Sequence, residues 1–198
     1  MRPLYLASAS PRRLELLRQI GVEPIVVPSS FLESEVLWGN PEHLAREYAL
    51  GKARGAVFGR LEVPRDSVII GADTVVALEG EIFGKPRDSE HASYMLQRLS
   101  GRAHEVVSGV AIVRPDGQYL LGSVCTEVTF RPLSAQEIAA YVATAEPLDK
   151  AGSYGIQGRG ALFVESIRGC YNNVVGLPLT KLCGLLRQWG VEVTEAWR

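Results

Sequence analysis

A turn near the N-terminus, rich in hydroxyls and arginines, has the residue types of an anion-binding site. Leu4–Ala7 is a short apolar run that predicts a buried strand, and Ser8–Arg13 follows where a helix is expected to begin. The N-terminal end of a helix carries free N–H groups and positive charge, which together bind anions. Arg12 and Arg13 add guanidinium donors suited to phosphate. The alternative is a capped helix with two solvated arginines.

Asp73 and Thr74 interrupt a long apolar stretch. Val68–Gly71 predicts a buried strand, and the apolar run resumes over Val75–Leu78. A carboxylate in such surroundings is costly to bury unless it is paired or bound to a metal. Asp73 would therefore ligate a hard cation or orient a water molecule. The alternative is an aspartate in a turn, hydrogen-bonded to its own backbone.

Three further candidates lie in irregular parts of the sequence. Lys85 stands between a glycine and a proline, which would hold its ammonium where it counters phosphate charge, although most lysines are simply solvated. Glu33 is a carboxylate in a stretch with no periodicity. The glycine-rich segment Asp149–Gly158 contains Tyr154, which could stack, and Gln157, which could read a base edge. The alternative for that segment is a structural turn.

Alternating strands and helices must position these groups. Strands are predicted at 4–7, 25–27, 68–71, 75–78, 81–83, 106–113, 118–130 and 161–167. Helices are predicted to follow the caps or first-turn prolines at Pro11, Asn40, Asp88, Ser134 and Pro178. This order predicts an α/β fold, a mixed twisted sheet flanked by helices. With no evident linker, residues 1–198 are expected to form one domain of two lobes around a cleft.

Composition excludes several classes of protein. The chain has 21 basic and 22 acidic residues, so it lacks the basic excess with which proteins coat nucleic-acid polymers. The three cysteines and three histidines show no zinc-ligand spacing, and cysteines so few and scattered favour a cytoplasmic location. No apolar stretch approaches the length of a membrane span. The sequence also lacks the Walker GxxxxGK[ST] pattern and the GxSxG elbow of serine hydrolases.

Six motifs together resemble the Maf family of nucleoside triphosphate pyrophosphatases. They cover nearly the whole sequence in order: LASASPRR at 6–13, GADTVV at 71–76, GKPRD at 84–88, LSGRAHEV at 99–106, EPLDKAGSYGIQG at 146–158 and NVVGLPL at 173–179. The resemblance implies a mixed α/β fold related to the inosine triphosphate pyrophosphatases. It also implies cleavage between the α- and β-phosphates with a divalent metal, Mg²⁺ or Mn²⁺, and a homodimer.

The resemblance also implies a role for each matched residue. Asp73 falls on the proton acceptor, and Glu33 and Lys85 fall on the acidic and basic catalytic positions. Glu33 and Asp73 would hold the metal. The substrate-binding positions are Ser8, Arg12, Arg13, Thr74 and Gln157.

The YGIQG pattern at 154–158 resembles the branch of the family that acts on dTTP and UTP. One rival within the same class is activity on 7-methyl-GTP or on modified pyrimidine nucleotides. A rival from another class is a nucleotide-binding regulator of cell division, because the family name is tied to septum formation. The presence of Asp73, Glu33 and Lys85 together argues against the regulator, because binding alone needs no base.

Overall fold

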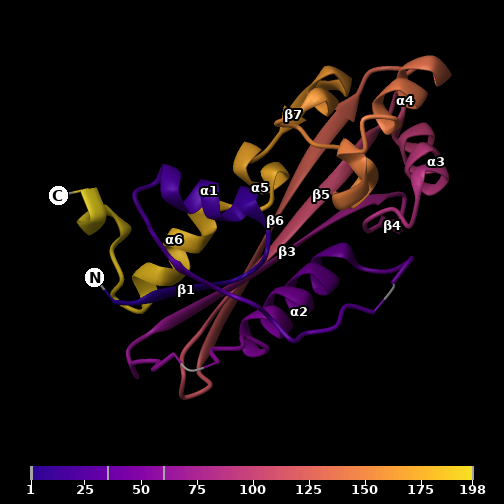
Figure 1. The fold of residues 1–198 in the computed structure, drawn as a ribbon. Coiled ribbons are helices and arrows are strands. Elements are labelled where there is room, and N and C mark those ends of the chain that lie inside the picture. Colours follow the sequence, from indigo (N-terminus) through magenta and orange to yellow (C-terminus); the bar gives the residue numbers. More distant parts are fainter. Residues whose placement is uncertain (1, 35, 60, 198) are drawn as a thin grey trace.

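The computed structural model describes residues 2–34, 36–59 and 61–197 and contains a seven-stranded mixed sheet (Figure 1). The strand order is β2-β1-β3-β5-β6-β7, and β4 pairs with β3. β1 is parallel to both β2 and β3, whereas the other pairs are antiparallel. The strands are β1 Leu4–Ala7, β2 Ile25–Val27, β3 Val68–Leu78, β4 Glu81–Phe83, β5 Ala103–Val113, β6 Tyr119–Phe130 and β7 Val164–Arg168. The predicted mixed sheet is confirmed.

Helices lie on both faces of this sheet. α2 covers one face, while α1, α5 and α6 lie on the other, and α3 and α4 pack at the far end (Figure 1). The helices are α1 Pro11–Gln19, α2 Pro41–Arg54, α3 Ser89–Leu99, α4 Ala135–Val142, α5 Tyr171–Val175 and α6 Leu179–Gln188. α5 was not predicted, because five residues are too few to show a helical period. No helix among the described residues is long and apolar enough to cross a membrane.

Three helix starts show the predicted capping chemistry, whereas α1 lacks a side-chain cap and α6 begins one residue after the predicted Pro178. Asn40 and Asp88 accept hydrogen bonds from the backbone of the first turn, and Ser134 forms a capping box with Glu137. Ser10 stands at the N-cap of α1, but its side chain makes no cap hydrogen bond. The α1 terminus therefore keeps backbone N–H groups for another partner.

β3 runs through Asp73 and Thr74 without a break, so the predicted interruption of the strand is wrong. On one edge, β5 pairs with β3 along Ile69–Ala77. On the other edge, β1 pairs only with Val68–Ile70, and β4 pairs only with Val76–Leu78. No strand of the described chain pairs with the intervening stretch on that edge. Asp73 and Thr74 therefore mark an opening at the edge of the sheet. The hydrophobicity pattern alone had indicated a break in the strand at this point.

Glycines allow α2 to approach the middle of the sheet closely. A Cβ atom on Gly71 of β3 would lie 2.2 Å from the carbonyl oxygen of Ala49. A Cβ atom on Gly109 of β5 would lie 2.1 Å from the carbonyl oxygen of Ala45. Both distances are far below van der Waals contact, so only glycine fits. This close packing brings the side chains of α2 within reach of the open edge of β3.

Two large apolar clusters lie along the sheet. The first gathers β1, the start of β3, α1 and α6, and the second gathers the end of β3, β4, α3 and α4. Between them, the predicted loop at 149–160 folds into 3₁₀ turns at Glu146–Asp149, Ala151–Ser153 and Arg159–Phe163. The last turn delays the strand predicted at 161, which begins at Val164.

We predict that Gly71→Ala lowers the free energy of unfolding by at least about 2 kcal/mol, because the added methyl group overpacks the contact between α2 and β3. Urea denaturation measures the change. Gly184→Ala is the matched control, because Gly184 lies inside α6 with no atom within 4 Å of its would-be Cβ. That change should raise stability by up to about 1 kcal/mol. Equal effects of the two substitutions would contradict the packing account.

Candidate active site

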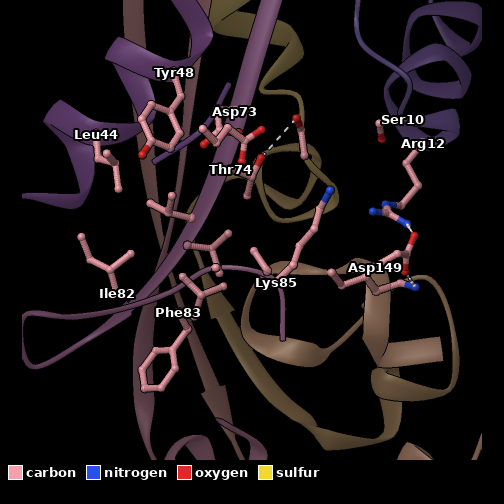
Figure 2. Close-up of a pocket in the computed structure, with 18 of the residues that line it drawn as sticks. Ser10, Arg12, Leu44, Tyr48, Asp73, Thr74, Ile82, Phe83, Lys85 and Asp149 are labelled. Carbon is pink, nitrogen blue, oxygen red and sulfur yellow. Dashed lines mark hydrogen bonds and ion pairs between the residues drawn. The ribbon is translucent and has the colours of Figure 1, made fainter. Parts of the chain in front are cut away.

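A cleft of about 940 Å³ opens at the unpaired edge of β3 (Figure 2). It is bounded by the turn after β1, the segment before α2, the turn after β4, and the glycine-rich loop. The structure brings together in this one cleft all eight residues predicted from the sequence: Ser8, Arg12, Arg13, Glu33, Asp73, Thr74, Lys85 and Gln157.

Asp73 and Thr74 divide the cleft between the two faces of the sheet, because successive side chains of a strand point to opposite faces. Asp73 points to the α2 face, where it meets Lys52. Thr74 points to the face of α1 and α5, where it meets Arg13 and the Gly176 carbonyl. A ligand at the open edge of β3 can therefore contact both faces at once.

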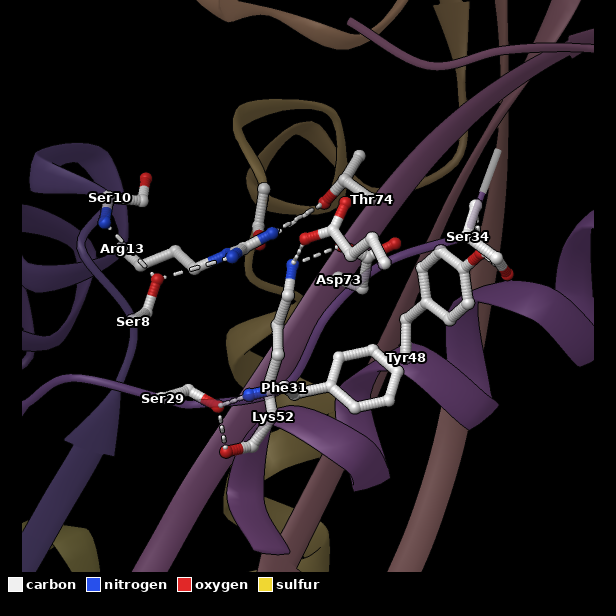
Figure 3. Close-up of polar contacts among 12 residues, drawn as sticks. Ser8, Ser10, Arg13, Ser29, Phe31, Ser34, Tyr48, Lys52, Asp73 and Thr74 are labelled. Carbon is white, nitrogen blue, oxygen red and sulfur yellow. Dashed lines mark hydrogen bonds and ion pairs between the residues drawn. The ribbon is translucent and has the colours of Figure 1, made fainter. Parts of the chain in front are cut away.

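Lys52 of α2 joins the two predicted carboxylates. Its Nζ atom lies 2.6 Å from Asp73 Oδ1 (Figure 3). The same Nζ atom lies 2.6 Å from Glu33 Oε1. Asp73 is 5% exposed, so its charge needs such a partner. Lys52 was missed as a site residue at the sequence level. The available indication was its position on the otherwise small and apolar stripe of α2, where an unpaired lysine is rarely found.

A set of hydrogen bonds fixes the segment that carries Glu33 against α2. Ser29 Oγ donates to the Lys52 carbonyl and accepts from the Phe31 N–H. The Tyr48 hydroxyl contacts the Ser34 hydroxyl at 2.9 Å and donates to the Ser34 carbonyl. The Phe31 ring packs on the Tyr48 ring (Figure 3). An irregular segment is thus held in place without regular secondary structure.

The electrostatics of the cleft keep its groups charged. Burial alone would raise the pKa of the Glu33 carboxyl, but the hydrogen bond and charge of Lys52, with Lys85 and Arg13, lower it overall. Burial lowers the pKa of the Arg13 guanidinium, while Asp73 opposes that shift. Arginine pKa values lie so high that Arg13 stays cationic.

The hydroxyl of Ser8 is arranged to donate. It accepts from the Ser10 N–H at 3.2 Å and from Arg13 Nη1 at 3.3 Å. Two acceptor contacts occupy both lone pairs of a hydroxyl, which leaves the proton for a third partner. Arg13 also donates from Nε to the Gly176 carbonyl at 2.9 Å. Arg13 therefore ties α1 to α5 and also faces the cleft.

Two more cations border the opening of the cleft. Arg12 Nη1 lies 3.2 Å from Asp149 Oδ2, so that α1 is joined to the glycine-rich loop across the cleft (Figure 2). The pair is partly exposed, so its energetic contribution is small, and a stronger anion can take the place of Asp149. Lys85 is exposed, and its side chain reaches up from the turn after β4 toward Thr74 (Figure 2).

A half-buried carboxylate shapes the loop that carries Gln157. Glu146 accepts from the Tyr141 hydroxyl at 3.0 Å and from the Arg159 N–H at 3.2 Å. The Tyr141 hydroxyl in turn accepts from the Gly155 N–H at 3.1 Å. These contacts hold the loop from both sides while Gln157 itself stays exposed.

Tyr154 anchors the same loop to the core. It is 6% exposed, and its hydroxyl lies 3.0 Å from His104 Nε2. Burial lowers the pKa of His104 to about 4, so this imidazole is neutral at pH 7. The ring of Tyr154 packs on Phe130. Tyr154 thus belongs mainly to the core, instead of offering a free stacking surface as the sequence suggested.

The carboxylates fit a cation that is shared with a polyphosphate. No group of three or more His, Cys, Asp and Glu side chains that could hold a metal ion occurs within the described parts of the chain. Asp73 and Glu33 nevertheless face one cleft from the same side. Mg²⁺ is often held by one or two carboxylates, several waters and the phosphates of a substrate. Two carboxylates beside a cluster of arginine and lysine match that mode of binding.

Comparison with known proteins identifies the family of this chain. Residues 3–189 match the family described as Maf-like protein. The dTTP/UTP pyrophosphatase of Symbiobacterium thermophilum is 47% identical over 98% of this chain and 97% of its own length. The protein of the same name from Carboxydothermus hydrogenoformans is 49% identical over 94% of this chain and 98% of its own length. The one from Bacillus anthracis is 46% identical over 99% of this chain and 100% of its own length. The chain belongs to the Maf family.

Two solved structures are similar to part of this chain. The Staphylococcus aureus Ham1 protein superimposes with a TM-score of 0.45 at 13% identity, over 65% of this chain and 72% of the other. A nucleoside-triphosphatase / dITP/XTP pyrophosphatase from Mycobacterium abscessus covers the same shares, with a TM-score of 0.39 at 18% identity.

We predict that Lys52→Gln raises the pKa of Glu33, because it removes the hydrogen bond and charge that hold that pKa down. It should also lower the free energy of unfolding by roughly 3–5 kcal/mol at neutral pH, because the buried Asp73 loses its partner. Carboxyl ¹³C NMR titration and urea denaturation measure the two effects. Lys181→Gln, at an exposed position on α6, is the control. An unchanged pKa of Glu33 in the Lys52 variant would contradict the proposed effect of the Lys52–Glu33 ion pair.

Proposed function

We propose that this protein hydrolyses dTTP and UTP to the nucleoside monophosphate and pyrophosphate, with a divalent cation. One observation carries the proposal: the Asp73–Lys52–Glu33 bridge lies at the open edge of β3, in the same cleft as Ser8, Arg12 and Lys85. A hydrolase needs that combination of buried carboxylate and phosphate-binding groups, and mere binding does not. The names of the full-length relatives support the same reaction.

The phosphate chain would lie along the turn between β1 and α1. The Ser8 hydroxyl has a proton to donate, and the α1 terminus adds N–H groups whose cap is missing. Arg12 would exchange Asp149 for a phosphate, and Lys85 would approach from the opposite wall. These fixed positive groups stabilise the charge that develops on the departing pyrophosphate.

Asp73 is the proposed proton acceptor. Its Oδ1 atom binds Lys52, which leaves Oδ2 to take a proton from the water that attacks the α-phosphorus. Asp73 and Glu33 would hold Mg²⁺, or Mn²⁺, and the bound cation would neutralise phosphate charge and lower the pKa of water. Lys52 lowers the pKa of the Glu33 carboxyl and, through its two ion pairs, holds both carboxylates in place for these tasks.

The nucleobase of the substrate would lie on the Thr74 face of the sheet. There the Gln157 side-chain amide can both donate and accept hydrogen bonds. All of these groups come from one continuous sheet and the helices and loops attached to it, so we propose that residues 1–198 work as one catalytic unit. The three cysteines are free thiols, which suits a cytoplasmic enzyme. The family resemblance extends the proposal to a homodimer.

A panel of nucleoside triphosphates with Mg²⁺ tests the proposed reaction. We expect dTTP and UTP to give monophosphate and pyrophosphate, measured by chromatography of the nucleotides and an assay for pyrophosphate. Release of inorganic phosphate instead would place the cleavage elsewhere. Preferential turnover of 7-methyl-GTP would favour the rival substrate class. Binding of nucleotide without any turnover would favour a regulator.

Asp73→Asn should lower kcat by about 10²–10⁴-fold, because the amide cannot accept the proton of the attacking water. Circular dichroism should show a folded protein, since Lys52 keeps Glu33 as a partner. Asp66→Asn, an exposed carboxylate outside the cleft, serves as the control and should retain full activity. Wild-type turnover by the Asp73 variant would exclude this residue as the base.

A further inference from the structure

Lys52 places a positive charge between the two carboxylates of the cleft. Its Nζ atom lies 2.6 Å from Asp73 Oδ1 and the same distance from Glu33 Oε1. Oxygens of one or two carboxylates are also what proteins offer to Mg²⁺. The ammonium of Lys52 and a divalent cation therefore compete for the same two oxygens.

Little water screens this competition at Asp73. The side chain of Asp73 is 8% exposed and that of Lys52 is 16% exposed, whereas Glu33 is nearly half exposed. Like charges about 4 Å apart in partly buried surroundings repel strongly enough to change a binding constant by more than tenfold. A second cation beside Asp73 is thus strongly disfavoured while the ammonium stays where it is.

Two further cations of the cleft add to this repulsion. Arg13 and Lys85 both lower the pKa of the Glu33 carboxyl, so the charge of each acts on that group. Asp73 in turn raises the pKa of the Arg13 guanidinium against the effect of burial. With Lys52, three positive charges act on two carboxylates. A divalent cation that enters alone meets negative charge that is already balanced.

A polyphosphate reverses this balance. Its phosphates bring several negative charges into the cleft and offer the ammonium new acceptors. Lysine suits such an exchange, because its compact ammonium donates three hydrogen bonds from the end of a flexible chain. The backbone of Lys52 stays fixed, since Ser29 Oγ donates to its carbonyl at 2.9 Å. Only the side chain of Lys52 has to move.

We propose that Lys52 is a built-in counter-ion that keeps a divalent cation out of the cleft until a polyphosphate arrives. This inference rests on the proposed function, which supplies the cation and the nucleotide. Lys52 holds Asp73 and Glu33 in the free protein and turns to a phosphate when cation and nucleotide bind together. The two ligands then bind cooperatively, and each raises the affinity for the other by the same factor. Asp73 has a positive partner throughout, so it never becomes a buried unpaired charge.

Titration of wild type with Mn²⁺, followed by electron paramagnetic resonance, tests the cooperativity. The α,β-imido analogue of UTP serves as a nucleotide that resists cleavage. We expect the free protein to bind Mn²⁺ at least about tenfold more weakly than its complex with the analogue, after correction for the affinity of the analogue itself for Mn²⁺. Equal affinities with and without the analogue would overturn the proposal.

Removal of the lysine charge should turn the two carboxylates into a permanent cation site. We expect Lys52→Gln to bind Mn²⁺ alone at least about tenfold more tightly than wild type. A merely structural defect would weaken the site instead. Lys181→Gln, at an exposed position on α6, is the matched control and should bind Mn²⁺ as wild type does. Adding Asp73→Asn to the Lys52→Gln variant should abolish the gain. An unchanged or lower affinity for Mn²⁺ in Lys52→Gln would contradict the proposal.

Thermal unfolding gives a second readout for Lys52→Gln. Mg²⁺ should replace the ammonium as the partner of Asp73 and raise the Tm of the variant, because a ligand that binds only the folded state stabilises it. The same concentration of Mg²⁺ should leave the Tm of wild type unchanged. A variant that folds only after Mg²⁺ is added would support the proposal equally. If Mg²⁺ neither raises the Tm of the variant nor restores its folding, the proposal is wrong.

The experiments with metal alone need no turnover, so they separate this proposal from the proposed reaction. If wild type hydrolyses no nucleoside triphosphate, the proposed reaction fails, while tighter binding of Mn²⁺ by Lys52→Gln still supports the role of Lys52. If wild type hydrolyses dTTP and UTP but Lys52→Gln gains no affinity for Mn²⁺, the reaction stands and the role of Lys52 is wrong.

Discussion

The ion pair between Asp73 and Lys52 is the interaction on which the cleft depends. A carboxylate in the middle of a buried strand would destabilise the sheet if it stood alone, and Lys52 stabilises it at 2.6 Å. That distance is reached only because α2 lies against the backbone of β3 where Gly71 leaves room. The same ammonium also binds Glu33 and thus brings a carboxylate from an irregular segment to the site. Helix packing and site chemistry are therefore a single constraint.

The open edge of β3 explains why so many distant segments meet at one place. Where β1 has ended and β4 has not begun, the strand exposes side chains to both faces of the sheet. The α2 face gathers the two carboxylates around Lys52. The α1 and α5 face gathers oriented hydroxyls and the glycine-rich loop. In the proposed reaction, acid–base chemistry and substrate recognition therefore take place on opposite faces of one strand.

Much of this could be predicted from the sequence, because the strongest patterns are local. Apolar runs placed the strands, and prolines with Asn40, Asp88 and Ser134 placed the helices. Asp73 was singled out as a candidate because a carboxylate within a strand is uncommon, and the structure places it in the cleft beside Lys52. Residue types and spacing supplied the other candidates, the family resemblance assigned each a role, and the structure gathers them in one cleft.

What escaped prediction depends on partners far apart in the chain. Lys52 lies on a helix whose period predicts only a buried stripe, and nothing local shows that Asp73 and Glu33 meet there. Continuity of β3 through two polar residues is imposed by the ladder with β5, which hydrophobicity does not register. Ser10 has the residue type of a cap, but its backbone N–H bonds to Ser8 instead.

The long strands β3 and β5 have a mechanical consequence. Together with β6 they run from one apolar cluster to the other, so a hinge between the two clusters would have to bend three hydrogen-bonded strands at once. Such a sheet is stiff, and the compliance of the molecule lies in the segments attached to it. Entry and exit of a ligand thus depend on small movements of loops. The exposed ion pair between Arg12 and Asp149, which joins α1 to the glycine-rich loop, would break and re-form during these movements.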